Sequence, residues 1–259
     1  MLLEGRVGIV SGIGPGVGRE VALAFAREGA HVVLAARTES ALESVADEVR
    51  ALGREALPIR TDVASAEECR HLIARTIEHF GRVDVLVNNA FMMYPTASIE
   101  DADFETWRAI FEVNLFGSLR LSQAVVPHMR AAGGGSIVMV NTMSIRIIEP
   151  NVGAYAASKG ALMTATQTLA KEVGPAGIRV NSVVPGYIWS EKMDAYFRHL
   201  ATEQGRTYDE VRTEVTGRTA LHHIPDSAEI AGSVLFFASD LSRAVTGQAL
   251  DVNGGHFFH

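Results

Sequence analysis

Residues 7–27 read VGIVSGIGPGVGREVALAFAR, a short apolar run that passes through a glycine-rich turn into a segment with helical spacing. A run of about 4–8 apolar, β-rich residues that ends in such a turn is typical of a buried parallel strand. Gly12, Gly16 and Gly18 permit a sharp turn and let backbone N–H groups at a helix N-terminus approach an anion. This stretch therefore predicts the first strand–helix unit of an α/β fold, with a nucleotide phosphate bound at the turn.

The same alternation continues to the end of the chain. Six later runs have the character of buried strands: HVVLAA, ALPIRTDV, VDVLVNNA, GSIVMVN, IRVNSVVPG and QALDV. Between them, Ser65 with Glu68 and Asp226 with Glu229 have the spacing of capping boxes at helix starts. Strands that alternate with helices predict a doubly wound, Rossmann-type parallel sheet of seven strands with helices on both faces.

No Pro/Gly/Ser-rich linker interrupts this alternation, so residues 1–259 are expected to form a single domain. Residues 190–223 break the rhythm with a mostly helical insertion, in which Met193, Tyr196 and Phe197 have helical spacing. One interpretation is a small helical cap whose apolar residues only pack against the body. The other is a substrate lid, which a position beyond the carboxyl end of a strand favours.

Composition narrows the choice of partners and compartment. The 23 Lys and Arg against 30 Asp and Glu give a net charge of −7, which argues against a nucleic acid or an anionic membrane as partner. Cys69 is the single cysteine, so no intrachain disulfide can form, and we expect it to be a buried, inert packing residue. The N-terminus lacks the pattern of a signal peptide, and no apolar stretch approaches about 20 residues. A cytoplasmic protein is expected.

The strongest chemical signal lies in residues 153–170, GAYAASKGALMTATQTLA. Tyr155 and Lys159 are four residues apart, so in a helix they project from one face. A tyrosine has an ordinary pKa of about 10, and a nearby ammonium would favour its phenolate and bring the pKa towards the working range. Many helices contain such a pair by chance, so it carries weight only in combination with other motifs.

Three motifs in the same chain order supply that combination. The glycine spacing at 12, 16 and 18, the Asn88-Asn89-Ala90 sequence and the Tyr155/Lys159 pair resemble those of the short-chain dehydrogenase/reductase family. The resemblance extends over essentially the whole chain, including the closing TGQALDVNGG. It implies a homotetrameric oxidoreductase that uses NAD(P)(H) to act on CH–OH groups. The positive charge of the oxidised nicotinamide would then act with the Lys159 ammonium to lower the Tyr155 pKa.

The resemblance also implies a set of cofactor-binding residues and no metal site. Besides Tyr155 and Lys159, this set comprises Gly12, Gly14, Gly16, Val17, Gly18, Arg37, Thr38, Asp62, Val63, Asn89, Ala90, Pro185, Gly186, Ile188 and Ser190.

The end of the second predicted strand bears on the choice of dinucleotide. An acidic residue there would bind the ribose 2′-hydroxyl of NAD(H), whereas an arginine suits the 2′-phosphate of NADP(H). In similar family members the acidic residue directly precedes the position of Arg37, and here Ala36 stands in its place. NADP(H) is therefore favoured, with Arg37 as the phosphate contact and Thr38 assisting. NAD(H) stays an alternative, because the basic residue often found in the glycine loop of NADP members is Pro15 here.

Two further catalytic groups follow from the resemblance. Asn114 corresponds to a helix asparagine that supports a water-mediated proton path to the lysine; the alternative is a residue that kinks or caps the helix. The substrate oxygen is usually bound by a serine after the fifth strand, a position that falls on Thr142. Threonine has the same donor and acceptor capacity, so Thr142 is favoured. Ser144 would share its face if the strand ran that far.

The expected substrate pocket is apolar. Phe91 stands where the family motif usually closes with glycine, and it either lines a pocket or only packs. The predicted pocket residues are Phe91, Met92, Met93, Tyr187, Met193, Tyr196 and Phe197.

These features predict a hydride transfer between NADP(H), or NAD(H), and a hydrophobic secondary alcohol or ketone. One alternative is a 3-oxoacyl thioester reductase, whose acidic carrier would need a basic patch. Four residues could supply one only weakly: Arg198, His199, Arg206 and Arg212. Another, from a different class, is a non-catalytic dinucleotide-sensing protein on the same fold. Intact Tyr155, Lys159 and Asn114 argue against it, since a sensor has no chemical need for them.

Overall fold

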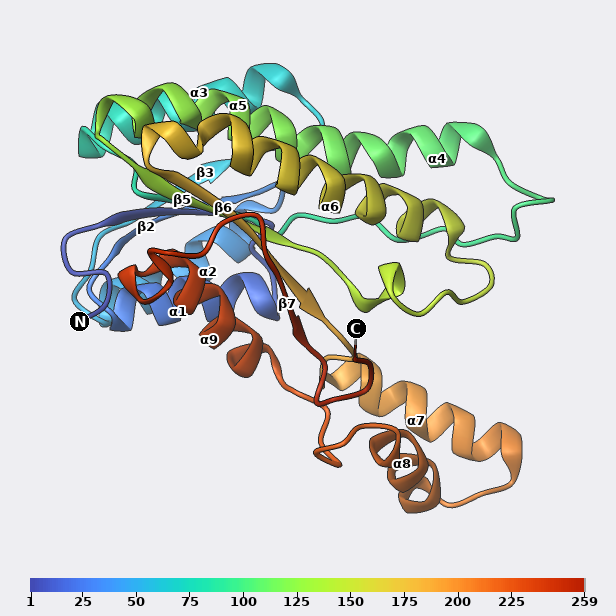
Figure 1. Cartoon of the computed structure of the whole chain (residues 1–259). Helices are drawn as coiled ribbons and strands as arrows, with labels where there is room; N and C mark the ends of the chain where they lie inside the picture. The colour runs from blue at the N-terminus through green and yellow to red at the C-terminus, as the bar shows by residue number, and fades with distance from the viewer. Residues whose placement is uncertain (259) are drawn as a thin grey trace.

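The computed structural model describes residues 1–258, in which seven strands form one parallel sheet of order β3-β2-β1-β4-β5-β6-β7 (Figure 1). The prediction of a doubly wound, seven-stranded fold is confirmed. The strands are β1 Val7–Ser11, β2 His31–Ala36, β3 Ala56–Arg60, β4 Val85–Asn88, β5 Gly135–Val140, β6 Ile178–Pro185 and β7 Ala249–Val252.

Helices cover both faces of the sheet. The α-helices are α1 Val17–Arg27, α2 Glu39–Ala51, α3 Ala66–Phe80, α4 Phe104–Phe111, α5 Ser118–Ala131, α6 Gly153–Val173, α7 Glu191–Gln204, α8 Tyr208–Gly217 and α9 Ser227–Ala238. A π-helical turn, η1 Glu112–Gly117, joins α4 to α5, and the 3₁₀ turns are η2 Met143–Ile145, η3 Gly174–Ala176 and η4 Asp240–Ser242. Figure 1 shows α3, α5 and α6 on one face, and α1, α2 and α9 on the other.

Successive strand residues supply two separate cores. Ile9 packs with the buried residues of α3, α5 and α6, whereas its neighbour Val10 packs with those of α1, α2 and α9. This follows from the two-residue period of a strand, which sends adjacent side chains to opposite faces. Because both faces are buried, every position of β1 must be apolar or small, and this explains the unbroken apolar run in the sequence.

Cys69 belongs to the first of these cores. It is fully buried on α3, and burial raises the pKa of its thiol to about 11. The thiol is therefore protonated at neutral pH, as expected of a packing residue.

The two predicted capping boxes differ in the structure. Asp226 and Glu229 form the complete reciprocal pair at the start of α9, as predicted. At α3 the prediction is half wrong: Ser65 accepts the Glu68 N–H, but the Glu68 carboxylate bonds to the Asp62 N–H instead, at 2.8 Å. The reason is that the Ser65 N–H already donates to the Asp62 carbonyl.

Residues 190–223 contain α7 and α8, which stand away from the body of the molecule beside the C-terminal segment (Figure 1). These helices enclose a small core of their own, made of Phe197, Ala201, Val211, Val215 and Ile224. Within residues 1–258, no helix combines the length and apolar character needed to cross a membrane.

Candidate active site

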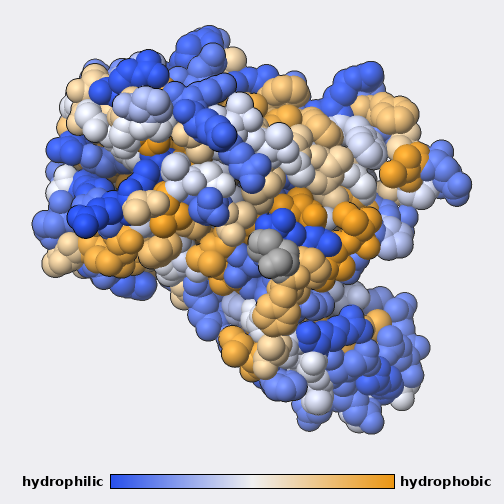
Figure 2. Space-filling model, in the orientation of Figure 1, coloured by the Kyte–Doolittle hydropathy of each residue, from blue (hydrophilic) through white to orange (hydrophobic). Residues whose placement is uncertain are grey.

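A cleft of about 840 Å³ opens at the carboxyl edge of the sheet, where the glycine loop before α1, the ends of β5 and β6 and the starts of α6 and α9 meet. Side chains and loops that follow parallel strands converge at this edge, which is the usual ligand site of an open α/β sheet. Figure 2 shows apolar side chains on the body beside the notch that separates it from the more polar lobe of α7 and α8.

Lys159 is buried beneath this cleft. It is 2% exposed, and its Nζ donates a hydrogen bond to the Val140 carbonyl at the end of β5, at 2.7 Å. Burial lowers its pKa to about 7, because a charged ammonium loses hydration in the protein interior. At neutral pH the ammonium and the neutral amine are therefore both populated.

Tyr155 lies one helical turn before Lys159 and lines the same cleft. Burial raises its pKa, and a hydrogen bond with the Thr142 side chain partly opposes that rise. Burial dominates this shift, and the lysine Nζ is bound to a main-chain carbonyl. The expectation that Lys159 and an oxidised nicotinamide together lower the Tyr155 pKa stays a prediction.

The two candidate hydroxyls lie side by side. β5 ends at Val140, so the premise that Ser144 lies on the same strand face as Thr142 is wrong. The 3₁₀ turn η2 nevertheless brings the Ser144 Oγ to 3.2 Å from Thr142 Oγ1, which donates to it. Of the two, Thr142 is the one that lines the cleft beside Tyr155.

Asn141 joins the catalytic segments, and the sequence interpretation did not single it out. Its Oδ1 accepts the Thr142 N–H at 3.0 Å, and its Nδ2 donates to the Lys159 carbonyl at 3.2 Å. It is 4% exposed, so these bonds fix Thr142 relative to α6. The sequence did hold one signal for Asn141: it is a polar residue directly between the buried strand β5 and the expected hydroxyl of Thr142.

Asn114 is fully buried in the π-helical turn η1, a local irregularity that often occurs at functional sites. Its Oδ1 accepts the Met92 N–H at 2.7 Å, and its Nδ2 donates to the Met92 carbonyl and to Ser158 Oγ, both at 2.9 Å. Its side chain thus ties the segment after β4 to α6. The water-mediated proton path expected from Asn114 stays a prediction.

The glycine loop fits a dinucleotide pyrophosphate. A Cβ on Gly12 would lie 2.5 Å from the Ala90 N, and one on Gly18 would lie 2.4 Å from the Gly12 carbonyl oxygen. Only glycine allows these close approaches, and Gly12 also has a positive φ of 78°. These contacts hold the loop tightly against the segment after β4, while the loop also lines the cleft at the N-terminus of α1, where the helix dipole favours a phosphate.

A second cavity, of about 250 Å³, adjoins the glycine loop between the ends of β2 and β3. Its lining includes Arg37, Thr38, Asp62 and Val63, the residues expected around the adenosine. Arg37 is exposed, and Thr38 begins α2 without using its hydroxyl to cap the helix. Both side chains are thus available to a ribose substituent. The other expected cofactor residues, which line one or both cavities, are Gly14, Gly16, Val17, Asn89, Ala90, Pro185, Gly186, Ile188 and Ser190.

A smaller cavity of about 100 Å³ reaches Tyr155 from the side of α4. Met93 lines it as predicted, together with Trp107, which the sequence interpretation missed. Phe91 is 62% exposed, and its ring centroid lies 6.4 Å from that of Tyr155 in an edge-on contact. Phe91 therefore borders the space where a substrate would meet the phenol. Met92 instead faces the adenosine cavity.

The lobe residues predicted for the substrate pocket have different surroundings. Phe197 is wrong as a pocket residue, because it is fully buried in the lobe core against Trp189. Met193 packs partly buried on that core, and Tyr187 packs there too, with its ring 5.6 Å from that of His256. Tyr196 is 54% exposed on α7 and is the lobe residue most open to a ligand.

Comparison with known proteins finds similarity along almost the whole chain. A family model described as enoyl-(acyl carrier protein) reductase matches residues 12–256. An uncharacterised oxidoreductase of Methylorubrum extorquens is 36% identical over 254 residues, 98% of each chain. The 7α-hydroxysteroid dehydrogenase of Escherichia coli K12 is 32% identical, covering 98% of this chain and 94% of its own.

Two more relatives widen the range of chemistry. The 3-oxoacyl-[acyl-carrier-protein] reductase of Thermotoga maritima is 32% identical, covering 98% of this chain and 99% of its own. Among solved structures, an NAD⁺-bound xylitol dehydrogenase superposes with a TM-score of 0.90 at 30% identity, covering 98% of this chain and 100% of its own.

Proposed function

The chain belongs to the short-chain dehydrogenase/reductase family, and from this premise we propose that it transfers a hydride between NADP(H) and a hydrophobic secondary alcohol or ketone. It is an NAD(P)-dependent oxidoreductase acting on CH–OH groups. One observation carries the proposal: Tyr155, Thr142 and Lys159 meet in the cleft that the glycine loop also lines. That arrangement brings a proton donor beside a dinucleotide site.

Each of these residues has a role in the proposed reaction. The chemistry that the dinucleotide supplies when bound is hydride acceptance in oxidation and hydride donation in reduction. In reduction the Tyr155 hydroxyl gives its proton to the carbonyl oxygen as the alcohol forms; in oxidation its phenolate takes that proton back. The Thr142 hydroxyl donates to Ser144 Oγ in the structure and would turn to donate to the substrate oxygen, which it orients. Lys159 provides positive charge beneath the phenol and donors for ribose hydroxyls.

We propose NADP(H) rather than NAD(H) as the preferred cofactor. Arg37 supports this proposal because it is exposed in the lining of the adenosine cavity, and a guanidinium binds a phosphate with two parallel hydrogen bonds. Ala36, in the same lining, offers no carboxylate to a ribose hydroxyl. The similar xylitol dehydrogenase structure is bound to NAD⁺, so NAD(H) stays the alternative cofactor.

The proposed substrate is apolar because Phe91, Met93 and Trp107 border the space around Tyr155. Reduction of a 3-oxoacyl thioester is the second candidate, and the Thermotoga relative favours it. A docking patch for an acidic carrier has little support, because Arg198 and Arg206 of the lobe are paired with Asp194 and Glu214. We further propose a cytoplasmic homotetramer, as the family resemblance implies.

The test is a screen of ketones and alcohols with both reduced and oxidised dinucleotides, read at the nicotinamide absorbance, with Tyr155→Phe beside the wild type. We expect the variant to bind NADPH normally and to lose turnover by about 10²–10⁴-fold. Tyr94→Phe, at a tyrosine that is 69% exposed, is the matched control and should keep full activity. An active Tyr155→Phe enzyme would refute the proposed proton transfer.

A further inference from the structure

The amino edge of the sheet, opposite the candidate active site, carries a second concentration of charge. Arg6 directly precedes β1, Arg179 lies at the start of β6, and Arg243 follows η4. These three arginines border a groove of about 550 Å³, together with Arg82 and the glycines that flank β5 and β6. Nothing in the proposed hydride transfer uses this groove.

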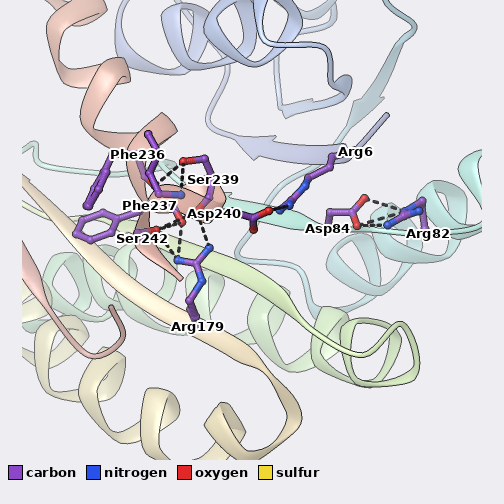
Figure 3. Close-up of polar contacts among 10 residues, drawn as sticks. Arg6, Arg82, Asp84, Arg179, Phe236, Phe237, Ser239, Asp240 and Ser242 are labelled. Carbon is purple, nitrogen blue, oxygen red and sulfur yellow. Dashed lines mark hydrogen bonds and ion pairs between the residues drawn. The ribbon is translucent and has the colours of Figure 1, made fainter. Parts of the chain in front are cut away.

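The carboxylate of Asp240 interacts electrostatically with all three of these arginines. Its Oδ2 accepts a hydrogen bond from Arg6 Nη2 at 2.6 Å, and Figure 3 shows its side chain extended towards Arg6. Asp240 lines the same groove as the arginines. The Arg6 hydrogen bond, with the positive charges of Arg6, Arg179 and Arg243, lowers the pKa of Asp240. A single negative charge therefore faces three positive charges.

The three arginines differ in how firmly they are held. Arg179 is fixed at the end of α9, where Nη1 donates to the Phe237 carbonyl at 2.8 Å and Nη2 donates to the Ser239 carbonyl at 3.1 Å (Figure 3). Burial lowers its pKa, and the neighbouring charge of Arg6 acts in the same direction. Arg243 is exposed and free to turn into the groove. The site thus combines a charge held by hydrogen bonds with an exposed one.

The ion pair between Arg6 and Asp240 is weak, so it does little to keep another anion out of this site. The Asp240 side chain is 75% exposed and that of Arg6 is 29% exposed, so water screens the pair. Exposed ion pairs of this kind contribute little to stability and exchange readily with other ions. A competing anion can therefore replace the Asp240 carboxylate without disturbing the fold.

The rest of the groove adds no net charge and little bulk. Arg82 is paired with Asp84, which also accepts the Val7 N–H at 2.8 Å and so belongs to the sheet edge. Gly134 and Gly177 contribute bare backbone, since a Cβ on Gly134 would lie 2.8 Å from the Gly177 carbonyl oxygen. The lining therefore holds four arginines and two aspartates, a net charge of +2 beside a backbone wall.

We propose that Arg6 and Arg243, above the fixed charge of Arg179, bind a phosphate dianion, either free or as the terminal group of a small phosphomonoester. Asp240 is the internal occupant that this ligand displaces. A dianion matches the excess positive charge better than one carboxylate does, and its tetrahedral oxygens accept the paired hydrogen bonds of a guanidinium. The site lies at the edge of the sheet opposite the dinucleotide cleft, so both ligands bind at the same time.

The experiment is a calorimetric titration of inorganic phosphate, and separately of glycerol 3-phosphate, into protein saturated with whichever reduced dinucleotide binds more tightly. Ionic strength is held constant with chloride, because charged contacts are sensitive to salt. Asp240→Asn removes the internal competitor and is expected to raise phosphate affinity by about tenfold. Arg243→Ala is expected to lower it by about tenfold. Arg70→Ala, at an exposed arginine of α3 outside the groove, is the matched control.

The outcomes separate the sources of the ligand and the alternatives. Tighter binding of inorganic phosphate identifies the free ion as the ligand, whereas tighter binding of glycerol 3-phosphate identifies a phosphomonoester. The proposal is overturned if Asp240→Asn leaves phosphate affinity unchanged, or if Arg243→Ala behaves like Arg70→Ala. Dinucleotide affinity and melting temperature are measured for every variant to confirm that it is folded. If Asp240→Asn does not fold, Arg243→Ala still tests the proposal, because the Arg243 side chain is exposed. Loss of hydride transfer activity would leave this result unaffected.

Discussion

Replacing Lys159 by methionine tests the electrostatic basis of the candidate site. Burial lowers the Lys159 pKa to about 7 from its ordinary value of 10.5, so the unfolded chain holds a proton that the folded protein has largely released between these two values. The free energy of unfolding therefore rises with pH across that window. Below pH 7 both states are protonated, and the folded protein bears the full free-energy cost of burying a charged amine. With these pKa values the cost is about 4 kcal/mol at pH 7 and about 2 kcal/mol at pH 9.

The assay is urea unfolding of the cofactor-free protein at pH 7, 8 and 9. We expect the free energy of unfolding of the wild type to rise by about 2 kcal/mol over this range relative to Lys159→Met, which keeps the unbranched stem but cannot titrate. Lys171→Met, at an exposed lysine on the same helix, should follow the wild type. Equal pH slopes for the wild type and Lys159→Met would refute the reasoning that burial controls this amine.

Three further predictions concern the cleft. Arg37→Ala should weaken NADPH binding by about tenfold or more and leave NADH binding unchanged in fluorescence titrations, because only the 2′-phosphate loses a charged hydrogen bond; equal losses would contradict its role. Thr142→Ala should lower the single-turnover rate more than Ser144→Ala does, and the reverse order would make Ser144 the polarising hydroxyl. Gly12→Ala should lower both melting temperature and dinucleotide affinity, since the new Cβ would lie 2.5 Å from the Ala90 N. Unchanged values would show that the loop can shift to accommodate a Cβ and that glycine is not required there.

Much of the candidate site was predictable because its motifs are local in the chain. The glycine loop follows β1 directly, and Tyr155 and Lys159 are separated by one turn of α6, so their relative placement depends on helix geometry alone. What their surroundings do to them was not predictable in this way. Burial in the cleft raises the Tyr155 pKa, and the fold directs the lysine Nζ to the Val140 carbonyl at the end of β5.

The remaining corrections have the same origin. Helical spacing predicted that Phe197 would lie on one face of α7, but not that α8 would cover that face and remove it from the cleft. Similarly, the grouping of Arg6, Arg179 and Arg243 joins residues far apart in the chain and has no signature in any one segment.

The strand–helix alternation and the glycine turn were readable from the sequence because hydrophobic periodicity and backbone freedom are properties of neighbouring residues. Which hydroxyl meets Tyr155, how far Lys159 is charged and which arginines share a groove were decided only by the tertiary structure. Burial, desolvation and charge–charge distance depend on residues that the fold brings together from distant parts of the chain.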